Sequence, residues 1–165
     1  FNVAVRWCRK AVQQGLVGAQ YSLGSMYFDG KGVSQDFNEA MRWYRIVADQ
    51  GVADAQCCLG DMYADGEGVA RNYNEAVRWY HKAADQGVAR AQCCLAAMYY
   101  FGMGVTQDLK QALFFILAAE AQGVVEEAQD LRVMVEADLR LTSSECPGLD
   151  APSARKCTCC GRDAD

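Results

Sequence analysis

Apolar and small residues recur along this chain with a fixed spacing of 36 positions. Four residue types follow that spacing in one phase: Leu23, Leu59, Leu95 and Leu131; Met26, Met62, Met98 and Met134; Gly15, Gly51, Gly87 and Gly123; and Trp7, Trp43 and Trp79. Agreement among four residue types indicates a tandem repeat. A repeat of this length is typical of a solenoid, in which each unit packs only against its neighbours.

The repeat at residues 55–90 begins with a predicted amphipathic helix. Leu59 and Met62 belong to one apolar face at helical spacing. Gly60 lies beside this face, and glycine inside a helix costs about 1 kcal/mol relative to alanine. A small residue here therefore indicates close approach of a paired helix. The same position holds a small residue in both neighbouring repeats, namely Gly24 and Ala96.

A tight loop and a second helix complete each unit. Gly66 is placed to end the first helix in a left-handed conformation, and Asn72 is a favourable N-cap for the second helix. Trp79 is expected on the inner side of this helix, which Gly87 ends. Three of its residues are expected to face water: Arg78, His81 and Lys82.

The pattern divides the chain into a solenoid and a tail. We predict an all-α fold, a right-handed α/α superhelix of helix–loop–helix repeats of 36 residues. The half repeat at the start indicates a fragment of a longer array, and the Pro, Ser and Cys content after 141 indicates a linker or tail. The predicted parts are a half repeat at 1–18, full repeats at 19–54, 55–90 and 91–126, a capping helix at 127–141, and a tail at 142–165.

The last full repeat departs from the others on its predicted outer side. Phe114 replaces an arginine found in both preceding repeats, and Leu117 replaces Arg45 and His81. An exposed apolar patch needs a cover. One interpretation is that the capping helix at 127–141 covers these residues, and the other is that they form a patch for a partner or a second copy.

The motifs of residues 55–87 resemble one repeat family. They are Ala-x3-Leu-Gly-x2-Tyr, Gly-x-Gly-Val, and Ala-x2-Trp-Tyr-x2-Ala-Ala followed by glycine. This pattern is similar to the Sel1-like repeat family, relatives of tetratricopeptide repeats with a longer loop, and it extends over residues 1 to about 135. The resemblance implies an α/α superhelix, a role as an adaptor or scaffold for proteins, and no active site in the repeats.

Composition narrows the possible classes of function. Apolar residues make up 52% of the chain, charged residues make up 22%, and the net charge is −5. Such an acidic balance disfavours nucleic acid, which needs a basic face. The longest apolar run, residues 112–119, is far shorter than the roughly 20 residues of a membrane span.

The cysteines of the repeats indicate whether the chain belongs in the reducing cytoplasm or outside the cell. Cys8, Cys57, Cys58, Cys93 and Cys94 lie in the repeats, and the two vicinal pairs occupy equivalent positions. Neighbouring helices are usually about 8–10 Å apart, which is wide for a disulfide. We therefore favour buried, reduced thiols in the cytoplasm. A disulfide-linked secreted solenoid is the alternative, and it would need one cysteine on each helix of a hairpin.

Cysteines of the tail raise the question of a metal. Cys157 and Cys160 have the Cys-x2-Cys-Gly spacing of a zinc knuckle, similar to one half of a MYND-type finger. Cys146 is a possible third ligand, and a closed site needs four. The tail is therefore a complete zinc site, part of a finger continued elsewhere, or a cysteine-rich segment without metal.

Catalysis has little support in this sequence. His81 is the only histidine, and the repeat pattern places no nucleophile or acid beside it. A surface histidine of this kind is usually solvated. We therefore predict a protein that is not an enzyme and that needs no cofactor, with zinc in the tail left as the one open alternative.

The expected function is protein binding in a concave groove lined by the first helices. The alternatives are a repeat module that presents substrates to a zinc finger or catalytic domain, and a structural spacer. Core positions of the first helices barely vary between repeats, whereas the predicted groove positions do. Those positions are Tyr21, Ser25 and Phe28; Cys57, Asp61 and Ala64; and Cys93, Ala97 and Tyr100.

Overall fold

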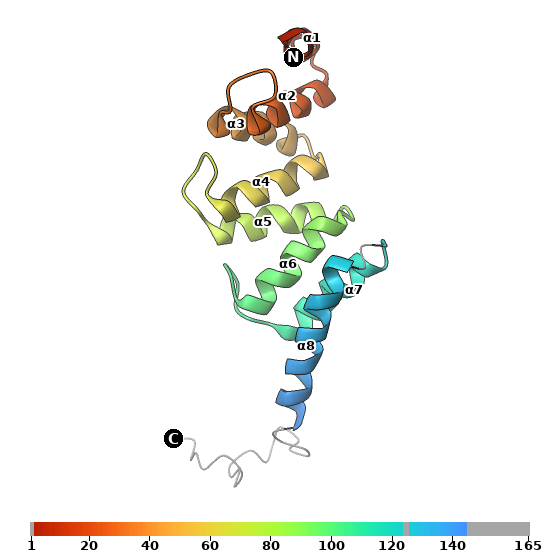
Figure 1. The fold of residues 1–165 in the computed structure, drawn as a ribbon. Helices are drawn as coiled ribbons and strands as arrows, with labels where there is room; N and C mark the ends of the chain where they lie inside the picture. Colours follow the sequence, from red (N-terminus) through yellow and green to blue (C-terminus); the bar gives the residue numbers. More distant parts are fainter. Residues whose placement is uncertain (1, 124–125, 145–165) are drawn as a thin grey trace.

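A computed structural model describes residues 2–123 and 126–144 of the chain. Eight α-helices, with no strand, make up this described part, and Figure 1 shows them stacked from α1 to α8. The predicted all-helical solenoid is confirmed. The tail cysteines considered as zinc ligands lie outside the described residues. The helices are α1 (Asn2–Gln13), α2 (Val17–Asp29), α3 (Phe37–Asp49), α4 (Ala53–Asp65), α5 (Tyr73–Ala84), α6 (Ala89–Phe101), α7 (Leu109–Glu120) and α8 (Glu126–Ser144).

Three helix pairs form the hairpins of the solenoid, namely α2 with α3, α4 with α5, and α6 with α7. Each hairpin also packs on the next one, through α3 on α4 and α5 on α6. Leu59 is fully buried and Trp79 is 5% exposed, as the period predicts. Trp7, its counterpart in α1, is 61% exposed. None of the described helices combines the length and hydropathy that a bilayer-spanning helix requires.

Loop residues close each hairpin by satisfying the helix ends. Gly66 adopts the left-handed conformation (φ 80°) and donates its N–H to the Met62 carbonyl. The Asn72 side chain then accepts from the N–H of Glu75 and caps α5. The Asn72 backbone N–H donates to the carbonyl of Tyr63. These bonds recur in the other hairpins and fix how the second helix returns along the first.

The small-residue position of the first helix is the site of closest helix approach. A Cβ built on Gly60 would lie 2.5 Å from the ring of Tyr80 in α5. On Gly24 the corresponding distance to Tyr44 is 3.0 Å. Where the third repeat has Ala96 instead of glycine, its partner position holds Ile116 in place of tyrosine, and both are fully buried. A tyrosine in the second helix is therefore found opposite a glycine in the first helix, and an isoleucine is found opposite an alanine.

A ladder of side-chain hydrogen bonds joins successive repeats. In each bond a polar residue of a second helix contacts the tyrosine hydroxyl of the following first helix. Arg45 additionally covers the Trp79 ring, with its guanidinium 5.5 Å from the ring centroid. The pairs are Arg9 with Tyr27 at 3.1 Å, Arg45 with Tyr63, and His81 with Tyr99 at 3.2 Å.

His81 differs from its predicted position. It is half-buried at the junction between repeats, whereas Arg78 and Lys82 are exposed as expected. Its ring contacts Tyr99 edge-on at 6.0 Å and Phe115 at 5.6 Å between centroids. The expectation that His81 faces water is wrong, because this helix position is covered by the next repeat.

Buried glutamines form a second set of contacts between helices. Gln86 at the end of α5 donates to Gln56 in α4 at 2.8 Å, and Gln56 donates to the Ala48 carbonyl in α3 at 3.1 Å. The same relay links Gln122, Gln92 and the Ala84 carbonyl. Because Gln56 is only 5% exposed, its amide needs these partners.

The most C-terminal described helix, α8, carries an ion network where earlier repeats have a small residue. α8 packs mainly on α7 and buries Ala128 and Val135. Arg132 occupies the position that holds Gly60 in the second repeat, and its guanidinium contacts Glu120 and Glu136 at 2.7 Å each. A further second helix would have to displace this ion network. The helix runs to Ser144, three residues beyond the predicted 127–141.

α8 does not cover the outer apolar residues of α7. Phe114 is 62% exposed and Leu117 is 45% exposed. The expectation that α8 covers them is wrong. Phe114 corresponds to Arg42 and Arg78, whose side chains are also exposed in the inner repeats, so position 114 faces away from the next repeat.

Replacing Gly60 by alanine tests the helix approach. We expect Gly60→Ala to lower the free energy of unfolding by about 1–3 kcal/mol through overpacking against Tyr80. Adding Tyr80→Ile, which copies the Ala96 and Ile116 pair of the third repeat, should recover part of that loss. Chemical denaturation of the single and double variants measures the coupling. Additive effects would contradict the close contact.

Arg45→Ala tests the ladder. Losing the Tyr63 bond and the cover over Trp79 should cost about 1–2 kcal/mol. Arg42→Ala is the matched control. Arg42 is exposed, and its contacts are with its own helix, Glu39 at 3.4 Å and the Trp43 ring at 5.7 Å, so its loss should change stability by less than about 0.5 kcal/mol. If urea unfolding shows that both variants lose the same free energy of unfolding, the ladder contributes no more to stability than the contacts of an exposed arginine do.

Candidate functional site

The exposed side chains of the first helices form one continuous face, which we call the first-helix face. In α2, α4 and α6 its residues recur at the repeat spacing, and in α8 the face continues one turn further, to Leu141. Several are fully exposed and several are half-buried. They are Gly18, Ser22, Ser25 and Asp29 in α2; Asp54, Cys58, Asp61 and Asp65 in α4; Arg90, Cys94, Ala97 and Phe101 in α6; and Asp130, Val133, Ala137 and Leu141 in α8.

Of the predicted groove positions, the middle one of each first helix lies on this face: Ser25, Asp61 and Ala97, all half-buried. The other predicted positions are turned toward neighbouring helices, and the expectation that they are exposed is wrong for the most buried of them. Cys57 is 1% exposed and Tyr100 is 9% exposed. The remaining members, all half-buried, are Tyr21, Phe28, Ala64 and Cys93.

Contacts between successive first helices explain this difference. The Tyr21 hydroxyl in α2 contacts the Cys58 thiol in α4 at 3.6 Å. Similarly, the Tyr100 hydroxyl donates to Asp138 in α8 at 2.8 Å. Phe28 packs edge-on against Phe37 at 5.4 Å between centroids. Tyr21 and Tyr100 therefore hold successive first helices together, whereas Phe28 packs on α3 within its own hairpin.

Asp61 occupies the centre of the first-helix face. Arg90 of α6 pairs with it at 2.7 Å, and the Tyr80 hydroxyl of α5 donates to it at 2.8 Å. The carboxylate thus links three helices. Burial raises the pKa of Asp61, and the bonds from Arg90 and Tyr80 oppose this effect without cancelling it. Its side chain is still 24% exposed, so a ligand can reach it.

Carboxylates accumulate around this centre. Asp54 and Asp65 are exposed on α4, and Glu67 follows in the loop. Partial burial, and then the negative charges of Asp65 and Asp61, raise the pKa of Glu67. Arg90 is the cation that pairs with Asp61. The middle of the face therefore has a negative potential.

Cysteine thiols near Asp61 are poorly suited to nucleophilic chemistry. Cys8, Cys57, Cys58 and Cys94 are free thiols. Burial, followed by the charge of Asp61, raises the pKa of Cys57 to about 12 and that of Cys94 to about 11. The thiolate is the reactive form of cysteine, so both side chains act as small packing groups at neutral pH.

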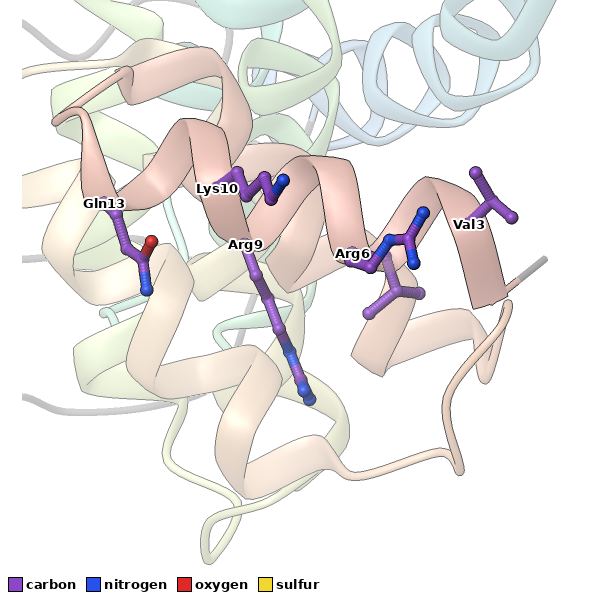
Figure 2. Close-up of a pocket in the computed structure, with 6 residues that line it drawn as sticks. Val3, Arg6, Arg9, Lys10 and Gln13 are labelled. Atoms are coloured by element: carbon purple, nitrogen blue, oxygen red, sulfur yellow. The ribbon is translucent and has the colours of Figure 1, made fainter.

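Two shallow hollows flank the N-terminal end of the solenoid. One, of about 370 Å³, lies between α1 and α2 and is lined by Ser22, Ser25 and Asp29 of the first-helix face. The other, of about 630 Å³, runs along α1. Figure 2 shows its basic side chains spaced along this one helix: Arg6, Arg9 and Lys10.

Metal-binding chemistry is not concentrated in the part of the chain that the structure describes. Within residues 2–123 and 126–144, no three His, Cys, Asp or Glu side chains are grouped to hold an ion. Cys146, Cys157 and Cys160 fall outside these ranges, so zinc binding by the tail stays a prediction.

Comparisons with known proteins place this geometry in a family. The Sel1 repeat model matches residues 1–16, 17–52, 53–88 and 89–124. A Sel1 repeat protein from Oxalobacter formigenes is 36% identical, with a TM-score of 0.75, over 84% of this chain and 56% of its own. The protective antigen c5321 of uropathogenic Escherichia coli is 34% identical, with a TM-score of 0.52, over 82% of this chain and 37% of its own.

A further structure supports the fold alone. Helicobacter pylori cysteine rich protein B is 24% identical, with a TM-score of 0.59, over 75% of this chain and 93% of its own. No curated protein matches the sequence. This chain spans only part of the first two relatives, and Sel1 repeats generally serve as protein–protein interaction modules. From its matched repeats and its helical stack, the chain belongs to the Sel1 repeat family.

Proposed function

We propose that this protein is an interaction scaffold that binds a segment of a partner protein on the first-helix face. The observation that carries the proposal is the contrast between constant and variable positions. Leu59 and its counterparts Leu23 and Leu95 are buried and identical in three repeats. The exposed position of Asp65, by contrast, holds aspartate in α2 and phenylalanine in α6. Constant residues build the stack, and variable exposed residues are available for recognition.

The arrangement of the first helices supports this role. Stacked hairpins present the same helix of each unit on one side, which gives an extended surface wide enough for a peptide or helix. The hollow of about 370 Å³ at Ser22 and Ser25 adds a recess at one end. Two of the groove residues predicted from the sequence, Tyr21 and Tyr100, have a different role in this proposal. They support the helices, and their exposed neighbours Ser22 and Phe101 face the partner.

Asp61 is suited to bind a partner at the centre of the face. Burial raises its pKa, so its ionised form is held at a cost in the free protein. A donor or cation from a partner would relieve this cost, because it adds a bond to the charged form. Perturbed carboxyl groups in surface recesses are common at functional sites.

Site-specific photo-crosslinking tests the proposal. A benzoyl-phenylalanine at Ser22 or Asp65 should capture a common partner in extract of the source organism. The matched positions Arg42 and Arg78 are also exposed but lie on second helices. They should give at most a tenth of the crosslinked product.

Equal capture from both sets of positions, or capture from Arg42 and Arg78 alone, would contradict binding on the first-helix face. Circular dichroism of each labelled protein establishes that the helices are retained. Because the comparison is between positions in one protein, partner abundance affects all four variants alike.

Asp61→Asn tests the cost of the central charge. A carboxyl group whose pKa is raised on folding binds its proton more tightly in the folded chain. Its contribution to stability is present at low pH and is lost as the pH rises through the folded-state pKa. We therefore expect the stability of the variant, relative to that of the native protein, to increase as the pH rises from about 4 to 7. Thermal melts across this range measure the difference, and a constant or shrinking difference would count against it.

A further inference from the structure

The C-terminal end of the first-helix face is apolar, unlike its centre. Phe101 is 59% exposed, Val133 is 64% exposed and Leu141 is 62% exposed. Two alanines belong to the same surface: Ala97 has the repeat position of Val133, and Ala137 has that of Phe101. We call this set the apolar ledge: Ala97, Phe101, Val133, Ala137 and Leu141.

A defined contact holds the two helices of the ledge together. Tyr100 of α6 donates its hydroxyl to Asp138 of α8 at 2.8 Å. The Tyr100 ring packs edge-on against Phe101 at 4.8 Å between centroids, and Asp138 follows Ala137 directly. Phe101 and Ala137 therefore flank one hydrogen bond, and the exposed residues of α6 and α8 form one surface. Figure 1 shows α8 next to α6 at this end of the stack.

Charge changes sharply from the ledge to the adjacent first helix. On α4, Asp65 occupies the register position that Phe101 has on α6. Asp65 is exposed, Glu67 is half-buried in the next loop, and Asp61 already pairs with Arg90. A segment crossing from α8 to α4 therefore meets apolar side chains first and then carboxylates.

We propose that the apolar ledge and the carboxylates of α4 bind an amphipathic segment of a partner protein, with an aromatic or aliphatic side chain on the ledge and Lys or Arg beside Asp65 and Glu67. This inference rests on the proposed function and names the kind of partner it serves. Aromatic and aliphatic anchors supply most of the affinity at such surfaces. Opposite charge next to the anchor orients the segment and speeds its association.

Charge disfavours a second copy of the chain as the occupant. The net charge of the chain is −5, so two copies of the chain repel each other as they approach. Apolar packing over the ledge would have to overcome this repulsion. A basic segment instead reduces the negative potential while its anchor removes the ledge from water.

Selection from a random peptide library tests the proposal. The library is displayed on phage and selected on the immobilised 165-residue chain. We expect enriched peptides that contain an aromatic or aliphatic residue with Lys or Arg nearby. Fluorescence polarisation of the labelled peptides should show at least a tenfold loss of affinity for Phe101→Asp and for Asp65→Lys.

Matched control variants separate the ledge from general surface effects. Phe114→Asp changes a phenylalanine of similar exposure on a second helix, and Asp49→Lys reverses an exposed aspartate at the end of α3. Both should change the affinity less than twofold. In a second control, the Lys and Arg residues of the peptide are replaced by Glu, which should abolish binding.

Four outcomes would overturn the inference. They are no enrichment, enrichment of acidic peptides, binding unaffected by Phe101→Asp, and concentration-dependent dimerisation that this variant abolishes. Binding that survives Phe101→Asp but is lost with Ser22→Trp would leave the first-helix face as the binding surface and remove the ledge from it. The failure of this inference is thus distinguishable from the failure of the proposed function.

Discussion

The structure depends on the way each second helix packs on both its own first helix and the first helix of the next repeat. An isolated helix of 12 or 13 residues is marginal in water. Each hairpin therefore needs neighbours, and the two-sided packing supplies them. Tyr80 fills the space left by Gly60 within the hairpin, while His81 on the same helix bonds Tyr99 of the next repeat. Adjacent residues of one helix thus serve the two interfaces.

Polar contacts give this apolar stack its register. The buried amide of Gln56 can be satisfied only if Gln86 and the Ala48 carbonyl are both in place. A repeat that slid along its neighbour would leave the amide unpaired, which costs about 1–3 kcal/mol. The glutamine relay and the tyrosine ladder therefore act against slippage, which apolar packing alone opposes weakly.

Fold and core were predictable because the period of 36 residues reports them directly. Leu59 and Trp79 repeat because a common core requires them, and both are buried. The binding face was predictable only in part. A first helix is contacted by its own second helix, by the preceding repeat and by the next first helix, so few of its non-core positions reach solvent. Periodicity separates core from non-core, but it does not separate Tyr100, which reaches Asp138, from the exposed Phe101 beside it.

The same limit explains the misjudged surface of α7. Because Phe114 is apolar and lies at an outward position, the sequence suggested that the following helix covers it. In a solenoid, however, the stacking direction decides which side of a helix is covered. Position 114 corresponds to exposed arginines in the inner repeats, so stacking leaves it outside. α8 carries Arg132, a charged side chain at the position where the preceding repeats keep a small residue for the packing of a second helix. The exposed apolar residues of α8 then extend the first-helix face beyond the hairpin of α6 and α7.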